Sequence, residues 1–360
     1  MKAVIVDAIN EFSVQDVSID PPKAGEVAID MKATGICRSD WSVITGHIPV
    51  ELPIVIGHEG AGVVQEVGAG VEHLQVGDHV VLSFIPHCGE CFYCEHDQAN
   101  LCSSNAQAQG FMLDGTARVK RGDEGLRVMT QLGCMAERCI APAISCIKID
   151  PEIPLASAAL VGCGVMTGVG AVLNTARVQA GSTVAVFGCG GIGLSIIQGA
   201  RIAGASQIIA VDTLDNKLAM ARSFGATHTV KGEQAQEFIL DLTEQRGADY
   251  CFEAVGIGAL MQAAEAATRP GGTCTIVGVG QLEDQFLLNP LMLPLMGKSI
   301  LGSMYGGCNP DRDFPRLLDF YREGKLDLDG MITTTYSIDQ APQAFADLQA
   351  GVNARGVIVY

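Results

Sequence analysis

A chain of 360 residues, 48% of them hydrophobic, is long enough to bury two cores, which favours two domains. Its 40 acidic and 23 basic side chains give a net charge of −17, which opposes binding to nucleic acids and to anionic membranes. No stretch approaches the roughly 18 consecutive apolar residues of a membrane span, and the N-terminus lacks a signal-peptide pattern, so we expect a cytoplasmic protein.

The first third of the chain has the pattern of short strands separated by Gly, Pro and Asp. The apolar runs lie at residues 3–6, 26–36, 60–68 and 77–84. We therefore expect an irregular, mostly β domain at the start of the chain. After residue 306 the pattern becomes mixed and ends in the β-like GVIVY, so we expect the C-terminus to return to this domain.

Four cysteines within this domain, Cys88, Cys91, Cys94 and Cys102, follow the spacing C-x2-C-x2-C-x7-C. A disulfide framework is not expected, because such scaffolds are short and secreted. Four thiolates close a tetrahedral zinc site completely, so the spacing predicts a structural zinc that replaces a hydrophobic core. An iron–sulfur cluster and free thiols are the alternatives, although the common bacterial cluster motif has a shorter third gap and a following Pro.

A second set of metal-binding residue types is spread along the chain. It comprises Cys37, His58, Glu59 and Cys163. Each residue alone is unremarkable, because a buried Cys is commonly a small core residue and a single His is commonly a surface or hydrogen-bonded group. Spacing alone therefore does not join these residues into one site.

From residue 182 onward, short apolar runs alternate regularly with helical patterns. Strands are expected at residues 182–188, 207–212, 248–256 and 273–280, with helices around 194–203, 216–224 and 259–268. This alternation predicts βαβ units in a doubly wound parallel sheet with helices on both faces.

The first of these βα turns carries a dinucleotide-binding pattern. Gly188, Gly190 and Gly193 form G-x-G-x-x-G between an apolar run and a helical pattern, where glycine permits the tight turn and the close approach of a pyrophosphate. Asp212 ends a following apolar run and would accept hydrogen bonds from ribose hydroxyls. A carboxylate there would repel a 2′-phosphate, and Thr213 adds no positive charge, so NAD is favoured over NADP. A structural turn without a ligand is the alternative.

The motifs GICRSD, GHEGAGVVQEVG, the four-cysteine stretch, GCGVMTG, VFGCGGIG and IIAVD occur in this order. Over essentially the whole chain they resemble the zinc-dependent alcohol dehydrogenases of the medium-chain dehydrogenase/reductase superfamily. The resemblance implies two zinc ions per chain and hydride transfer between a primary or aromatic alcohol, or the matching aldehyde, and NAD. It also implies a mostly β GroES-like catalytic domain (residues 1–164 and 307–360) and a Rossmann NAD-binding domain (165–306) within an α/β fold.

Residue roles follow from the resemblance by position. Cys37, His58 and Cys163 would bind the catalytic zinc, a ligand set that leaves a fourth position open in alcohol dehydrogenases. Glu59 resembles a carboxylate that approaches the metal during ligand exchange. Asp40 resembles the carboxylate that orients the zinc-bound histidine.

A proton relay and a substrate pocket are implied in the same way. Ser39 resembles the hydroxyl that takes the alcohol proton, and a turn-forming Ser is its alternative. Ser42 replaces the family's relay histidine, so either Ser42 with water or His47 would complete the path. Trp41 and Phe84 match positions in the pocket wall, and ordinary core packing is the alternative for both.

Cofactor contacts are also carried over from the family. Arg38 and Arg355 resemble residues that pair with the pyrophosphate, a task that suits a bidentate guanidinium. The complete predicted set is Arg38, Thr167, Gly188, Gly190, Gly191, Ile192, Gly193, Asp212, Lys217, Val277, Val279 and Arg355.

The long segment between Cys102 and Cys163 resembles the longer, dimeric branch of the family, which includes dehydrogenases acting on thiol adducts of formaldehyde. The apolar stretch at residues 286–303 is interrupted by Pro and Gly, so no helix is expected there. In the family this region joins two subunits, so we expect a homodimer, with a tetramer as the second choice.

Two alternatives to an alcohol dehydrogenase stay open at this point. One is a thiol-adduct (S-hydroxymethyl) formaldehyde dehydrogenase, and the other is a non-catalytic dinucleotide-binding protein with a structural zinc. Cys163 counts against a polyol dehydrogenase, because polyol members typically carry Glu at that position.

Overall fold

The computed structural model describes residues 1–104 and 110–360, which form two compact units. Unit 1 comprises Met1–Cys163, Asn309–Asp319 and Leu328–Tyr360, and unit 2 comprises Gly164–Cys308 and Phe320–Asp327. The sequence places the divisions after residues 164 and 306 and assigns no part of 320–327 to the nucleotide domain. The functional assignment of the domains and their limits remains a prediction.

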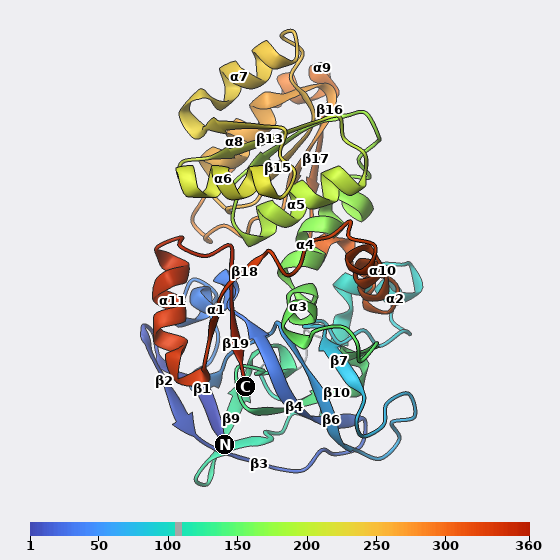
Figure 1. Cartoon of the computed structure of the whole chain (residues 1–360), viewed down its shortest axis with the longest axis vertical. Helices are drawn as coiled ribbons and strands as arrows, with labels where there is room; N and C mark the ends of the chain where they lie inside the picture. Colours follow the sequence, from blue (N-terminus) through green and yellow to red (C-terminus); the bar gives the residue numbers. More distant parts are fainter. Residues whose placement is uncertain (105–109) are drawn as a thin grey trace. The chain divides into compact units, whose positions relative to one another are not determined.

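Unit 1 is built on two mixed sheets. In the seven-stranded sheet, β4, β6 and β7 lie side by side, as Figure 1 shows, and β10 pairs with the other edge of part of β4. The C-terminal strand pairs with β4, so the end of the chain returns to the first domain as the sequence indicates. The strands in spatial order are β11 (Cys146–Ile149), β7 (His79–Leu82), β6 (Gly60–Val67), β4 (Glu26–Gly35), β19 (Arg355–Val359) and β18 (Ile332–Tyr336), together with β10 (Arg138–Pro142).

The second sheet of unit 1 buries apolar side chains on both of its faces. Val4 and Val6 of β1 join one buried cluster, whereas Ala3 and Ile5 join another, as expected when alternate residues of a strand point to opposite faces. The strands are β2 (Glu11–Asp16), β1 (Lys2–Ala8), β5 (Ile54–Val55), β9 (Glu124–Val128), β8 (Val119–Arg121) and β3 (Ser18–Ile19). The helices assigned wholly or mainly to unit 1 are α1 (Arg38–Ile44), α2 (Phe92–Glu95), α3 (Leu155–Ala159), α10 (Pro310–Arg322) and α11 (Ala341–Gln349).

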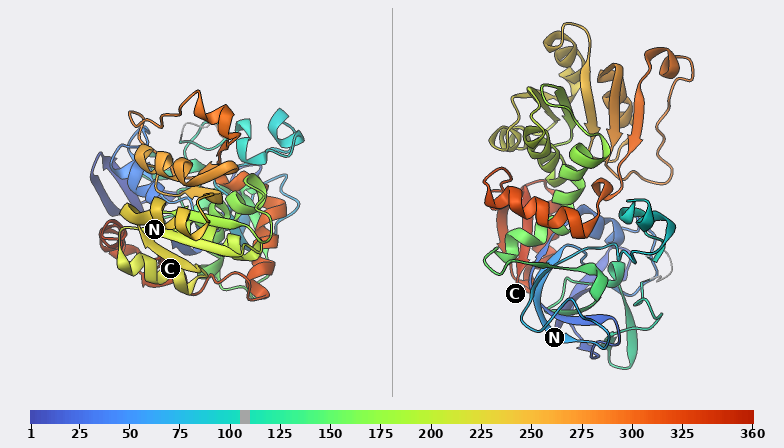
Figure 2. Two further views of the ribbon diagram at one scale, coloured as in Figure 1. Left: turned by 90° about the horizontal axis from the view of Figure 1, so that it is seen from above. Right: turned by 90° about the vertical axis from the view of Figure 1, so that its right-hand side faces the viewer.

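Unit 2 contains a six-stranded sheet in which every neighbouring pair is parallel. The right-hand view in Figure 2 shows its strands running side by side. The spatial order is β14 (His228–Lys231), β13 (Gln207–Asp212), β12 (Thr183–Phe187), β15 (Ala248–Glu253), β16 (Thr268–Ile276) and β17 (Ser299–Gly302). From β12 the sheet grows first toward one edge, through β13 and β14, and then toward the other, through β15, β16 and β17. Ligands of such sheets bind beyond the carboxyl ends of the strands where the strand order changes side, here between β12 and β15.

The helices of unit 2 follow the predicted alternation. The helices predicted around 194–203, 216–224 and 259–268 are present as α5 (Gly191–Ile202), α6 (Asp215–Ser223) and α8 (Gly258–Ala267). The sequence analysis did not predict β14 or the helix that follows it, α7 (Ala235–Leu242). The unit begins with α4 (Gly164–Gly170), which contacts α5.

The expectation of no helix within residues 286–303 was wrong. Residues Met292–Met296 form α9, and Ser299–Gly302 form the edge strand β17. Pro294 is the third residue of α9, where its missing N–H costs no intrahelical hydrogen bond. Gly297 ends the helix in the left-handed conformation, with a φ of 58°.

No single helix in the described ranges is long and apolar enough to cross a membrane. The bent pair Leu155–Gly162 and Gly164–Thr175 passes that test only when its two parts are taken together. Residues Ala158–Val172 of this pair are buried inside the structure.

Candidate functional site

The three residues predicted to bind the catalytic zinc come together in unit 1. Cys37 precedes α1, His58 lies between β5 and β6, and Cys163 follows a short 3-10 turn. One side-chain donor atom from each lies within 4.8 Å of the others, and all three side chains are buried. His58 Nε2 lies 3.3 Å from Cys163 Sγ. Two thiols and one imidazole form a donor set that suits zinc and leaves a fourth coordination position.

The Asp40 side chain connects the segment that carries Cys37 with the segment that carries His58. This fully buried side chain accepts hydrogen bonds at Oδ1 from His58 Nδ1 (3.0 Å) and from the Gly57 N–H (3.1 Å). Its Oδ2 accepts from the Cys37 N–H at 3.2 Å. With the Nδ1 proton directed to Asp40, His58 presents Nε2 to the two sulfur atoms, as a histidine ligand of a metal requires.

The two thiols of the cluster share one site and have opposite shifts in acidity. The hydrogen bond from Cys163, with further help from the His58 charge, holds the pKa of the Cys37 thiol well below its ordinary value. The same contact and burial raise the pKa of the Cys163 thiol well above its ordinary value. The two thiols thus differ in how readily they lose a proton, and a divalent cation bound between them would favour the thiolate form of both.

Glu59 and Arg355 form a buried ion pair beside the cluster. Arg355 Nη2 donates to Glu59 Oε2 and, at 3.3 Å, to the Ile36 carbonyl. Glu59 Oε1 has no hydrogen-bond partner among residues 1–104 and 110–360. Burial raises the pKa of Glu59 to about 7, and the Arg355 charge opposes this rise. Arg355 is thus placed beside a candidate metal-binding residue, and its predicted contact with a pyrophosphate remains a prediction.

The predicted relay and pocket residues have different surroundings. Ser39 Oγ lies 3.8 Å from Cys37 Sγ, and the Phe84 ring meets the His58 ring edge-on with centroids 5.7 Å apart. The Trp41 ring packs on Phe345 at 6.1 Å within a core cluster, which agrees with its alternative as a packing residue.

Two further residues of the predicted cofactor and relay sets lie near Ser39 in the sequence. Arg38 is exposed. His47 Nδ1 lies 2.8 Å from Thr45 Oγ1, so this ring is already engaged by a neighbouring hydroxyl.

The four cysteines of residues 88–102 also converge. Their sulfur atoms all lie within 4.8 Å of one another, with Cys102 Sγ 3.6 Å from Cys88 Sγ and 3.9 Å from Cys91 Sγ. Backbone N–H groups, that of Ser103 foremost, lower the pKa of Cys91 to about 5, whereas burial raises the pKa of Cys94 to about 12. No residue of α2 is buried, so a bound metal rather than a hydrophobic core would hold this lobe together.

The glycine-rich turn of unit 2 has the geometry that its pattern predicts. A Cβ at Gly193 would lie 1.8 Å from the Gly188 carbonyl oxygen, so only glycine allows α5 to start this close to β12. Asp212 accepts at Oδ2 from the Cys189 N–H (2.8 Å) and at Oδ1 from the Leu214 N–H (3.0 Å). The carboxylate is thereby fixed beside the turn.

The other predicted cofactor residues lie in the same unit. Thr167 in α4, Lys217 in α6 and Val277 after β16 are buried, whereas Val279 is 80% exposed. The contacts of these residues with NAD remain predictions.

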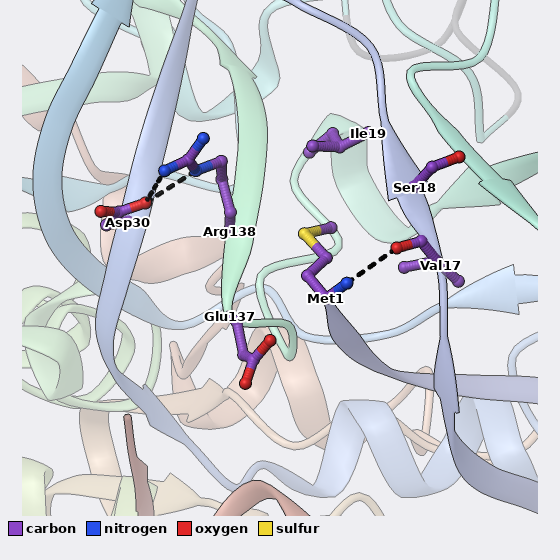
Figure 3. A pocket seen from close by; sticks show the side chains of 7 residues that line it. All are labelled: Met1, Val17, Ser18, Ile19, Asp30, Glu137 and Arg138. Atoms are coloured by element: carbon purple, nitrogen blue, oxygen red, sulfur yellow. Dashed lines mark hydrogen bonds and ion pairs between the residues drawn. The ribbon is translucent and has the colours of Figure 1, made fainter.

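A cavity of about 440 Å³ lies elsewhere in unit 1, lined by residues that belong to neither cysteine cluster. Figure 3 shows two polar contacts among the side chains and main-chain groups that line it. Asp30 pairs with Arg138 at 2.7 Å, and the N-terminal ammonium group of Met1 donates to the Val17 carbonyl at 3.0 Å. Glu137, the remaining charged residue of the lining, accepts a hydrogen bond at Oε2 from the Lys2 N–H (2.8 Å).

Comparisons with known proteins agree with this geometry. Residues 23–151 match the family model of the alcohol dehydrogenase GroES-like domain, and residues 191–323 match that of the zinc-binding dehydrogenases. Alcohol dehydrogenase B of Mycobacterium tuberculosis is 41% identical over 376 aligned positions, which cover 99% of this chain and 97% of that protein. The chain belongs to the zinc-dependent alcohol dehydrogenases. This family lies within the medium-chain dehydrogenase/reductase superfamily.

Two further relatives extend the comparison. S-(hydroxymethyl)glutathione dehydrogenase of Paracoccus denitrificans is 38% identical, and the alignment covers 99% of both chains. The crystal structure of benzyl alcohol dehydrogenase from Acinetobacter calcoaceticus superposes with a TM-score of 0.94 at 30% identity, covering 99% of this chain and 98% of that one. The predicted family, the α/β fold and the alcohol dehydrogenase type of enzyme are thus confirmed.

Sequence reasoning missed one buried acidic residue of unit 2, Glu253 at the end of β15. A signal was present, because a carboxylate follows the apolar pair Cys251 and Phe252 and directly precedes Ala254 and Val255.

Proposed function

We propose that this enzyme oxidises primary or aromatic alcohols to aldehydes with NAD, at a zinc ion held by Cys37, His58 and Cys163. The observation that carries the proposal is the buried convergence of these three donors with Asp40 behind the imidazole. When bound, zinc would lower the pKa of an alcohol hydroxyl and NAD would accept the hydride. A second zinc in the four-cysteine lobe would be structural, because four thiolates leave no open position.

The residues of the chain supply orientation, charge and a proton path. Asp40 fixes the His58 tautomer, so that Nε2 stays free of a proton. Ser39, next to the cluster through its 3.8 Å contact with Cys37, would receive the proton of the alcohol. Phe84, packed edge-on against His58, would provide an apolar wall near the reacting carbon.

NAD is proposed over NADP because of Asp212. Its carboxylate is held by the Cys189 and Leu214 N–H groups at the end of β13, where it would accept hydrogen bonds from ribose hydroxyls and repel a 2′-phosphate.

A thiol adduct of formaldehyde is the second candidate substrate. The relative from Paracoccus denitrificans, an S-(hydroxymethyl)glutathione dehydrogenase, aligns with the whole chain and favours this candidate. The third alternative, a non-catalytic binding protein, is not retained, because the relatives are dehydrogenases and all three ligand residues are present here.

A homodimer is proposed from the exposed apolar side chains around α9. Leu282 is 95% exposed, Leu295 71%, Leu287 67% and Leu291 64%, and a face this apolar is usually covered by a partner. A second copy of the chain is the proposed partner, and a tetramer is the second choice.

The test is NAD reduction by purified, zinc-loaded enzyme across short-chain, aromatic, terpenoid and polyol alcohols and thiol–formaldehyde adducts. The proposal expects turnover with primary or aromatic alcohols, preference for NAD over NADP, and loss of activity in Cys163→Ala. Turnover confined to the thiol adduct would favour the second candidate. Failure of every substrate with a fully metallated protein would overturn both.

A further inference from the structure

Glu253 lies at the carboxyl end of β15, where three turns of unit 2 meet. Its side chain is fully buried, and it pairs in register with Phe187 of β12 and Ile276 of β16. The turn after β12 contains Gly188, and the turn after β16 contains Val277. Both residues belong to the predicted cofactor contacts.

The carboxylate caps the turn that follows its own strand. Oε1 accepts hydrogen bonds from the Val255 N–H (2.9 Å) and the Gly256 N–H (2.8 Å). Its main-chain carbonyl accepts from the Val277 N–H (2.9 Å) and the Gly278 N–H (3.0 Å). One residue therefore ties residues 254–256 and 277–278 to the end of β15.

The second carboxylate oxygen is without a partner. Oε2 is inaccessible to solvent and makes no hydrogen bond within the described part of the chain. A Cβ at Gly278 would lie only 2.7 Å from it. Burial raises the pKa of this carboxyl group, and the backbone N–H groups of the turn oppose the rise. A buried, half-satisfied carboxyl group is costly to keep, which points to a use for its position.

The capped turn presses directly on the glycine-rich turn. A Cβ at Gly188 would lie 2.3 Å from Val255 Cγ2, and a Cβ at Gly256 would lie 2.3 Å from the Val279 carbonyl oxygen. Movement of residues 255–256 would therefore displace Gly188 on one side and Val279 on the other. Val255 is itself 44% exposed and Ile257 46%, so the turn presents apolar side chains at this edge of the sheet.

We propose that Glu253 is a positioning residue for the dinucleotide: by capping the turn at 254–256, it holds the glycine-rich turn in the shape that receives the pyrophosphate. The inference rests on the proposed use of NAD. Glu253 acts through Val255 and Gly256, and it is assigned no contact with the cofactor.

The test compares Glu253→Ala with Glu253→Gln, which keeps an acceptor oxygen. Glu237→Ala, at an exposed carboxylate in the first turn of α7, is the matched control. The readouts are the NADH dissociation constant from fluorescence, zinc content, the KM for alcohol, and hydrogen exchange at the amides of residues 255 and 256. Loss of the acceptor should raise the NADH dissociation constant about tenfold in Glu253→Ala, with alcohol KM and zinc content unchanged. Glu253→Gln should stay within about threefold of wild type, because its amide oxygen can accept the same N–H groups.

A purely structural role would lower the thermal midpoint and leave the NADH dissociation constant of the folded protein unchanged, which would overturn the proposal. Should Glu253→Ala not fold, Glu253→Asp replaces it: its shorter side chain should weaken NADH binding and speed exchange at residues 255 and 256, and wild-type values of both would also overturn the proposal. If wild-type enzyme itself binds no NADH, the proposed cofactor is wrong and the inference falls with it. If wild type and variants all bind NADH equally well, only the role of Glu253 is wrong, and the proposed cofactor stands.

Discussion

At the scale of single residues, Asp40 links the local fold to the candidate zinc site. One carboxylate accepts hydrogen bonds from the His58 ring, the Gly57 N–H and the Cys37 N–H, so it fixes two ligands that lie 21 positions apart in the sequence. Its complete burial makes each of these bonds expensive to lose.

Replacing Asp40 with Asn should damage the zinc site without unfolding unit 1. The amide has a single acceptor oxygen, so either the His58 ring or the Cys37 N–H loses its partner. We expect a loss of about 10- to 100-fold in zinc affinity or in kcat/KM, the usual effect of removing a carboxylate behind a metal-bound histidine. Zinc retention during dialysis against a chelator, followed by alcohol oxidation, measures both quantities.

Asp30→Asn is the control, because among residues 1–104 and 110–360 the Asp30 carboxylate pairs with the partly exposed Arg138, at the cavity of Figure 3 and away from both cysteine clusters. Equal zinc retention and equal activity in the two variants would show that Asp40 has no special role at the metal site.

At the scale of elements, Asp249 connects three strands of unit 2. From β15 it accepts at Oδ2 from the Thr183 N–H of β12 (2.8 Å) and at Oδ1 from Arg269 Nε of β16 (2.6 Å). Burial alone would raise its pKa, but the Thr183 N–H and the Arg269 guanidinium outweigh burial and hold the pKa of Asp249 below its ordinary value.

The stability that Asp249 contributes should therefore depend on pH. Because its folded pKa is lowered, the contribution is full above the unfolded pKa of about 3.9 and is lost as the pH falls through the folded value. Asp249→Asn should lower the free energy of unfolding by about 1 to 2 kcal/mol near neutral pH. The difference between variant and wild type should shrink by about pH 3.

Thermal unfolding of wild type and Asp249→Asn, near neutral pH and at about pH 3, checks this pH dependence. Asp241→Asn is the control, because this exposed carboxylate accepts a hydrogen bond from the Gln245 side chain in the described part of the chain. A difference that stays constant over this pH range would exclude the ion pair as its source.

The strands β12, β13, β15 and β16 and the helices α5, α6 and α8 of unit 2 were predictable because each carries its own periodic signal, whereas β14 and α7 were not predicted. The helix α9 was not, because Pro294 and Gly297 count against a helix unless they stand at its first turn and its end. In unit 1 the apolar patterns of β1, β4, β6, β7 and β19 were visible in the sequence, but the strands with which they pair were not. The pairing of β19 with β4 joins segments from opposite ends of the chain, and no local pattern encodes such a pairing.

Contacts between distant segments, which no local pattern encodes, also limit what the sequence shows of the candidate zinc sites. Cys88, Cys91, Cys94 and Cys102 lie close in the chain, so their spacing alone predicts a metal. Cys37, His58 and Cys163 are joined only by the fold, and before the structure only the family resemblance connected them. The Glu59–Arg355 pair depends on the return of β19 beside β4, so its geometry had no sequence signal.

At the scale of the whole molecule, the exposed apolar face around α9 bears on assembly. Leu295→Glu would place a charge on α9, among these exposed apolar side chains, and should weaken a homodimer about 100-fold, the effect of disrupting a residue that contributes strongly to an interface. Sedimentation velocity over a range of concentrations measures the change. Ile9→Glu, at a 59% exposed apolar residue of unit 1, should leave assembly unchanged. A wild-type protein that is monomeric at all concentrations would contradict the dimer.

The central claim is that the chain holds one open zinc site for chemistry and one closed site for structure. The most direct test is the zinc content per chain of wild type, Cys163→Ala and Cys94→Ala, measured on the same samples as NAD reduction. The account predicts two zinc ions in wild type and one in each variant, with Cys163→Ala folded, its lobe metal retained and its alcohol oxidation abolished. A Cys163→Ala protein that keeps both the zinc content and the activity of wild type would contradict the account.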